Sequence, residues 1–91
     1  MLTTESEVLA RVRSFVVENF LYMRPDYVLG DDDRMLEHGV IDSMGVLELL
    51  HFIEDEFRVS ASDDEITEAN LGTLRSIARF VATKRSASQA A

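Results

Sequence analysis

Three segments of this chain repeat their apolar residues with the period of an α-helix, and no segment of useful length alternates as a strand does. In the first segment, residues 4–20, Thr4 followed three residues later by Glu7 has the form of a capping box. Its apolar residues fall on one stripe about 140° wide: Val8, Leu9, Val12, Phe15, Val16 and Phe20. The sequence therefore predicts an all-α fold.

The second predicted helix starts at Asp42 or Ser43, either of which can cap it, and runs to about Phe57. Five apolar residues form its inner stripe: Val46, Leu49, Leu50, Ile53 and Phe57. The opposite sector holds Ser43, Met44, Leu47, Glu48, His51, Glu54 and Asp55. Apolar residues among acids are typical of a docking surface for a partner, although a solvated helix face is equally compatible with the periodicity.

Two helices are predicted after residue 58. A short one opens at Ser62 or Asp63 and ends at Ala69, and the last is capped by Thr73 and ends near Lys84. The inner stripe of the last helix is Leu74, Ile77, Ala78, Phe80 and Val81. The expected architecture is a small four-helix bundle, with three main helices and one short helix, in a single domain over residues 1–85. Residues 86–91 are predicted to form a flexible C-terminal tail.

A long loop, Leu21–Ile41, joins the first two helices and contains Pro25, Gly30 and Gly39. Loops of this length in small domains usually pack or perform a function. We expect it to be pinned to the helices by Tyr27, Val28, Leu29, Met35, Leu36, Val40 and Ile41, with a short helical turn near Arg34–Glu37.

Charge and composition exclude several classes of function. Lys and Arg number 9 and Asp and Glu number 17, for a net charge of −8, which disfavours nucleic acid and anionic membranes as partners. No cysteine is present, so disulfides, thiolate metal sites and a cysteine nucleophile are excluded. The N-terminal residues lack the pattern of a signal peptide, and no apolar run approaches the roughly 20 residues of a membrane span. We expect a cytoplasmic monomer.

Acidic and histidine residues do not form a recognisable catalytic or metal site. An EF-hand loop beginning at Asp31 would need Asp or Asn and then Gly where Met35 and Leu36 stand, so residues 31–33 are predicted to be a solvated acidic loop. His51 lies eight residues from Ser43, about 12 Å along a helix, which is too far for a catalytic pair. We therefore expect no metal and no enzymatic activity.

Three consecutive acids, Glu54, Asp55 and Glu56, occupy the last turn of the second helix, where the helix dipole disfavours negative charge. This placement favours the hypothesis that the cluster meets a basic partner and does not stabilise the helix.

The segment GVIDSMGVLELLHFIEDEF around Ser43 resembles the modification site of acyl carrier and peptidyl carrier proteins. Their pattern is Asp-Ser-Leu/Met at the start of the second helix, then an amphipathic run that ends in acids and Phe. The segment VSASDDEITEANLGTLRSIARFV resembles the third and fourth helices of the family. The resemblance extends from about Val8 to Lys84. Gly45, where many fatty-acid carriers have an acid, and His51 make the chain more similar to the freestanding carriers of polyketide and nonribosomal peptide pathways.

The resemblance implies that Ser43 carries a covalent 4′-phosphopantetheine arm, installed from coenzyme A by a phosphopantetheinyl transferase. The arm would hold acyl groups as thioesters for an acyl- or aminoacyl-loading ligase and for downstream synthase or transferase enzymes. By the same resemblance, the partners contact Asp42, Met44, Leu47, Glu48, His51, Glu54 and Asp55. Two alternatives stay open: an aminoacyl or peptidyl cargo, and an acidic helical interaction domain without a prosthetic group.

Overall fold

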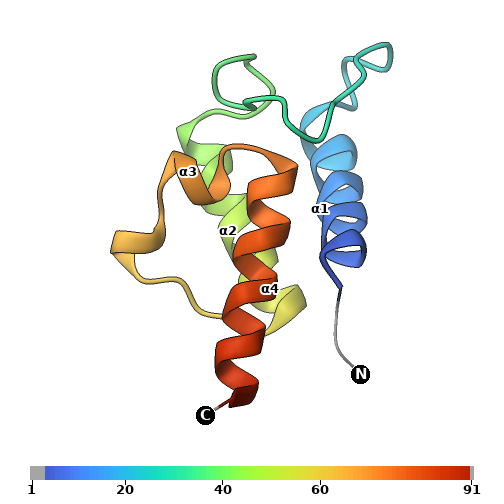
Figure 1. Ribbon diagram of the computed structural model, residues 1–91. Coiled ribbons are helices and arrows are strands. Elements are labelled where there is room, and N and C mark those ends of the chain that lie inside the picture. The colour runs from blue at the N-terminus through green and yellow to red at the C-terminus, as the bar shows by residue number, and fades with distance from the viewer. Residues whose placement is uncertain (1–3, 91) are drawn as a thin grey trace.

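The computed structural model describes the backbone of residues 4–90 and the side chains of residues 4–85. Within this part the chain forms, in order, α1 (Glu5–Phe20), α2 (Ser43–Phe57), a 3-10 turn η1 (Asp63–Glu65), α3 (Glu68–Leu71) and α4 (Leu74–Ala90), and no strand. The three long helices run side by side, and the connection between α1 and α2 lies across one end of them (Figure 1). The predicted all-α architecture of three main helices and one short helix is confirmed.

Side chains cap three helices at the predicted positions. The Thr4 hydroxyl accepts the N–H of Glu7 at 3.1 Å, and the Thr73 hydroxyl accepts the N–H of Ser76 at 3.0 Å. Of the two candidates for α2, Asp42 is the cap, because its carboxylate accepts the N–H of Gly45 at 2.7 Å.

The short helix predicted to run through Ala69 is wrong in its bounds. The segment is divided into η1 and α3 because the Thr67 hydroxyl caps a new helix, accepting the N–H of Asn70 at 3.2 Å. In η1, Glu65 accepts hydrogen bonds from the Ser62 N–H and from Lys84 Nζ. These two contacts, the first more than the second, lower the pKa of the Glu65 carboxyl.

The predicted core stripes are confirmed on all three long helices, with Leu9, Phe15, Phe20 and Val46 only partly buried. The prediction that apolar residues hold the long connection on the helices is confirmed for four residues that are buried: Leu29, Met35, Val40 and Ile41. Tyr27 is partly buried against the core. The same prediction is wrong for Val28 and Leu36, which are 87% and 40% exposed. Val28 directly precedes buried Leu29 in a segment without helix or strand, and its own side chain lies outside the core.

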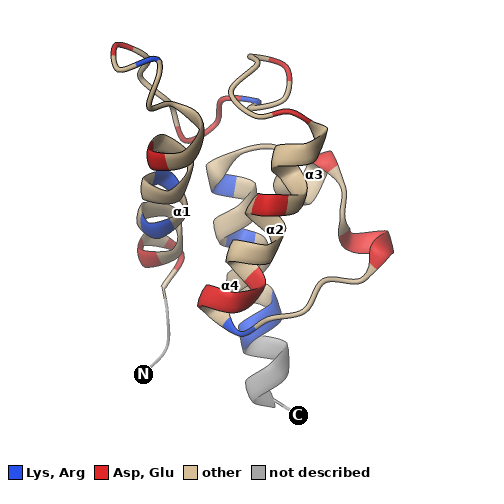
Figure 2. Ribbon diagram, turned by 180° about the vertical axis from the view of Figure 1, so that it is seen from behind, with Lys and Arg blue, Asp and Glu red and all other residues tan. Residues whose placement is uncertain are grey.

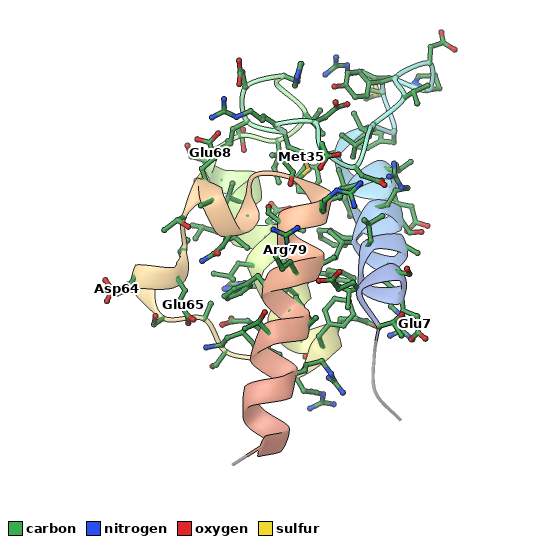
Figure 3. All side chains as sticks on the ribbon, viewed as in Figure 1. Glu7, Met35, Asp64, Glu65, Glu68 and Arg79 are labelled. Atoms are coloured by element: carbon green, nitrogen blue, oxygen red, sulfur yellow. The ribbon has the colours of Figure 1, made fainter. Side chains whose placement is uncertain are left out.

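Met35 anchors the connection to the rest of the fold. Its side chain is fully buried, and its N–H donates to the Gly72 carbonyl at 2.9 Å. The predicted helical turn follows, with the His38 N–H donating to the Arg34 carbonyl at 2.9 Å. Met35 lies under the connection at the end of the helices (Figure 3).

The aspartates of residues 31–33 lie in an acidic loop in which the Asp32 side chain is 72% exposed, as the sequence predicts, but they also make specific contacts. Arg13 of α1 donates to Asp31 and to the Leu29 carbonyl, and Arg75 of α4 donates to Asp32 at 2.7 Å. Asp33 accepts the N–H of Gly30 at 2.8 Å. The hydrogen bond to Asp32 also raises the pKa of the Arg75 guanidinium. These aspartates therefore fasten the connection to two helices, and the described residues hold no cluster of potential metal ligands.

The last helix continues past its predicted end near Lys84 as far as Ala90. The side chains of the predicted tail, residues 86–91, lie outside the described part of the chain. Among the described residues, no helix combines the length and apolar character needed to cross a membrane.

Candidate functional site

Ser43 is the first residue of α2, and its side chain is exposed. Asp42 satisfies the N–H of Gly45 with its carboxylate and the N–H of Val46 with its carbonyl, at 2.7 and 3.0 Å. The N–H groups of Ser43 and Met44, which precede them in the first turn, have no intrahelical acceptor by helix geometry. Such a turn stabilises an anion through these N–H groups and through the helix dipole.

An apolar groove begins at Ser43 and runs between α2 and α3. It encloses about 320 Å³ and is lined by Leu36, Ser43, Val46, Leu47, Ile66, Thr67, Glu68, Leu71 and Gly72. Sequence reasoning missed this groove, because its far wall comes from residues 66–72, which the helical wheel of α2 does not include. The half-exposure of Leu36 is explained by its place in the groove wall.

The far wall of the groove is tied to the α1–α2 connection by Arg34. Its guanidinium donates to Glu68 of α3 at 2.8 Å and pairs with Glu37 at 3.2 Å. Hydrogen bonding to Glu68 raises the pKa of the Arg34 guanidinium. Glu68 lies on the part of α3 nearest the connection (Figure 3).

Most residues of the predicted partner face of α2 are exposed. Met44 and Leu47 are 72% and 51% exposed, and Asp42, Glu48, His51 and Asp55 are exposed beside them. The helix carries acids and no Lys or Arg, as its red and tan ribbon shows (Figure 2). Glu54 departs from this pattern because it is half-buried and accepts the N–H of Ala61 at 3.0 Å.

The acidic cluster at the end of α2 therefore has a structural role that the sequence-based hypothesis denied. Glu54 holds the segment after the helix, and Glu56 pairs with Arg11 of α1 at 3.0 Å. Arg85 of α4 donates to the Phe57 carbonyl and supplies the positive charge that the last turn of α2 lacks. Of the three acids, only Asp55 forms neither an ion pair nor a side-chain hydrogen bond with another described residue.

Comparison with known families identifies the class of protein to which this fold and site correspond. A family model described as "Phosphopantetheine attachment site" matches residues 16–81. The chain belongs to this phosphopantetheine-binding family, in agreement with its resemblance to acyl and peptidyl carrier proteins. Its cofactor is covalent 4′-phosphopantetheine, and carrier domains of this family interact with transferases and synthases. No curated protein matches the chain at a significant level.

The geometry around Ser43 is compatible with this group. A phosphopantetheine arm needs an accessible hydroxyl, a setting that tolerates a phosphodiester anion, and space along the surface for a thin, flexible chain that contains two amides. Ser43 is exposed on a helix N-terminus and lies at one end of the apolar groove.

The contacts of the acidic cluster predict opposite effects for two neighbouring acids. Glu54→Ala removes the acceptor of the Ala61 N–H and should lower the free energy of unfolding by about 1–3 kcal/mol. Asp55→Ala removes an unfavourable charge from a helix end and should leave stability unchanged or raise it by about 0.3–1 kcal/mol. Urea denaturation at neutral pH measures both, and equal losses in the two variants would contradict the assignment of Glu54.

Proposed function

We propose that this protein is a discrete acyl carrier, with its 4′-phosphopantetheine arm attached to Ser43 through a phosphodiester. It presents acyl intermediates to partner enzymes of polyketide, nonribosomal peptide or fatty acid biosynthesis. The terminal thiol of the arm supplies the thioester chemistry that a chain without cysteine lacks. The proposal is carried by one observation: an exposed serine on the first turn of α2, inside the region matched by the family.

The residues around Ser43 have separate roles in this proposal. Asp42 fixes the first turn of α2 by capping it, and so holds the Ser43 hydroxyl in one place for the transferase. The N–H groups of Ser43 and Met44 lie where they stabilise the phosphodiester anion. A flexible arm then keeps its cargo at high effective concentration near each docked enzyme.

Replacing Ser43 tests the attachment site. Wild-type protein incubated with coenzyme A, magnesium and a broad-range phosphopantetheinyl transferase should gain the mass of one phosphopantetheine, whereas Ser43→Ala should gain none. The variant should stay folded, because Asp42 and not Ser43 caps α2. Intact-mass spectrometry and circular dichroism give the two measurements. Modification of the variant would place the arm on another serine, and no modification of a folded wild type would favour an interaction domain without a prosthetic group.

The apolar groove favours an aliphatic acyl cargo over an aminoacyl cargo. Five of its lining residues are aliphatic, namely Leu36, Val46, Leu47, Ile66 and Leu71. A charged ammonium group would lose hydration in such a groove without gaining a partner of its own, except near Glu68 at the edge. An aliphatic chain instead gains free energy for each methylene it buries, about 0.8 kcal/mol.

Thermal denaturation of loaded protein tests the cargo. Octanoyl-loaded protein should melt several degrees above acetyl-loaded protein, since each kcal/mol shifts the Tm of a domain of this size by about 4–8 °C. Ile66→Glu puts a charge into the groove and should abolish the difference. Val28→Glu is the matched control, because Val28 is 87% exposed and does not line the groove. Equal Tm values for the two wild-type acyl forms would contradict burial of the cargo.

The exposed face of α2 is proposed as the surface that the transferase and the client enzymes contact. It comprises Asp42, Met44, Leu47, Glu48, His51 and Asp55, with Glu54 at its edge. Met44 and Leu47 offer apolar contact, and Glu48 and Asp55 carry charges that no described Lys or Arg neutralises. A basic partner surface complements this face, and the attraction should act mainly on the association rate.

Charge reversal tests the face against net charge. Glu48→Lys should slow modification of Ser43 at low salt, and the deficit should shrink near 1 M salt, where screening extends only about 3 Å. Glu18→Lys is the matched control: it makes the same charge change at an exposed position of α1 that forms no ion pair with a described residue. The initial rate of transfer measures both variants. Equal slowing by Glu18→Lys would show that only overall charge matters.

A further inference from the structure

Gly45 is buried in the first turn of α2, two residues after Ser43. Its N–H is the group that Asp42 accepts at 2.7 Å. The residue therefore lies at the contact that starts the helix, and its backbone position is coupled to the position of Ser43.

A side chain at residue 45 would collide with its surroundings. A Cβ atom built there would lie 2.6 Å from Cγ1 of Ile41, 2.9 Å from Cε1 of Phe20 and 3.3 Å from Oδ1 of Asp42. Ordinary van der Waals contact starts at about 3.4 Å. Any residue other than glycine must therefore displace the side chains of Ile41 and Phe20, or shift the first turn of α2 away from them.

The end of the connection, next to Gly45, is held in place by burial and by backbone hydrogen bonds. Ile41 is buried, and the amides of Val40 and Ile41 both donate to the carbonyl of Met35, at 2.9 and 3.4 Å. Met35 is itself fully buried. Because Ile41 directly precedes Asp42, a shift of Ile41 moves the cap as well.

The ring of Phe20 is also held in place. It meets Phe15 edge to face at 5.9 Å between ring centroids. Phe15 in turn stacks on Phe52 of α2 at 4.2 Å, and Phe52 meets Phe57 edge to face at 6.2 Å. The four rings form a row between α1 and α2, so a movement of Phe20 away from Gly45 changes its edge-to-face contact with Phe15.

We infer that Gly45 is a positioning residue for the modification of Ser43. Its missing side chain lets Ile41 and Phe20 pack directly on the first turn of α2, and this packing holds Asp42 and Ser43 in the arrangement that the transferase uses. The inference rests on the proposed attachment at Ser43. Gly45 itself is buried and does not touch the partner.

Gly45→Ala tests the inference, because it adds one methyl group and no charge. Ala is a better helix former than Gly, so at an unconstrained position this change would stabilise the helix. Here we expect kcat for the transfer to Ser43 to fall roughly tenfold or more, since a displacement of about 1 Å can cost on the order of 10²-fold. KM should change little, because the exposed face of α2 is intact. The amide of residue 45 should also lose protection from hydrogen exchange, a readout that needs no transferase.

Two further variants separate positioning from loss of stability. Ile41→Ala in the Gly45→Ala background removes the nearer colliding atom, Cγ1, and leaves the contact with Phe20. It should restore kcat and the protected amide part of the way toward the values of Ile41→Ala alone. Ile53→Ala weakens the fold lower on the same helix, where the side chain is fully buried, and should leave kcat unchanged while the protein is folded.

Normal kcat and normal protection in Gly45→Ala would overturn the inference. So would an equal fall of kcat in Ile53→Ala, or a double variant as slow as Gly45→Ala. Failure of the proposed function is seen separately, as a wild-type protein that gains no phosphopantetheine mass on Ser43.

Discussion

The burial of Met35 is the constraint on which the rest of the structure depends. A connection of about 20 residues has a large conformational entropy, and it stays on the end of the bundle only if apolar side chains and backbone hydrogen bonds hold it. Met35 provides both: its side chain is fully buried, its N–H is bonded to Gly72, and its carbonyl accepts two amides that lead directly into Asp42. The start of α2, and with it the place of Ser43, is therefore set by a residue in the middle of a loop. The same anchor also sets one wall of the groove, because Gly72 ends α3.

The acidic composition is used in two different ways. Asp31 and Asp32 pair with arginines of α1 and α4, Glu68 pairs with Arg34, and Glu56 pairs with Arg11. Because most of these pairs are exposed, each contributes little to stability, and their effect is chiefly to fix where the connections lie. The outer face of α2 has acids but no arginine or lysine, so its negative charge is not neutralised within the helix. Part of the net charge of −8 is therefore offset locally by arginines, whereas the charge on the outer face of α2 is not.

Helix positions and types were predictable because they depend on local periodicity and on caps within four residues. The predictions failed where a residue's environment comes from a distant segment. Val28 has an apolar side chain typical of a core, but it is exposed, whereas its neighbour Leu29 is the residue that is buried. Glu54 lies within the sector that the wheel assigns to solvent, but the chain returns after α2 and brings the Ala61 amide to it. The division of the short helix into η1 and α3 depends on two capping residues, Ser62 and Thr67, which lie five residues apart. Either residue can start a helix, and the sequence alone does not show which one does.

The sequence by itself determined the all-α class, the stripes of the three long helices, the exposure of Ser43, Met44 and Leu47, and the family. These follow from spacing along one helix and from a contiguous motif, which are properties of neighbouring residues. Only the tertiary structure decided that an apolar groove runs from Ser43 to α3, that Arg85 of α4 completes the end of α2, and that Gly45 has no room for a side chain. Each of these requires atoms more than about four residues apart in sequence to meet, and hydrophobic periodicity specifies which face is buried but not what lies against it.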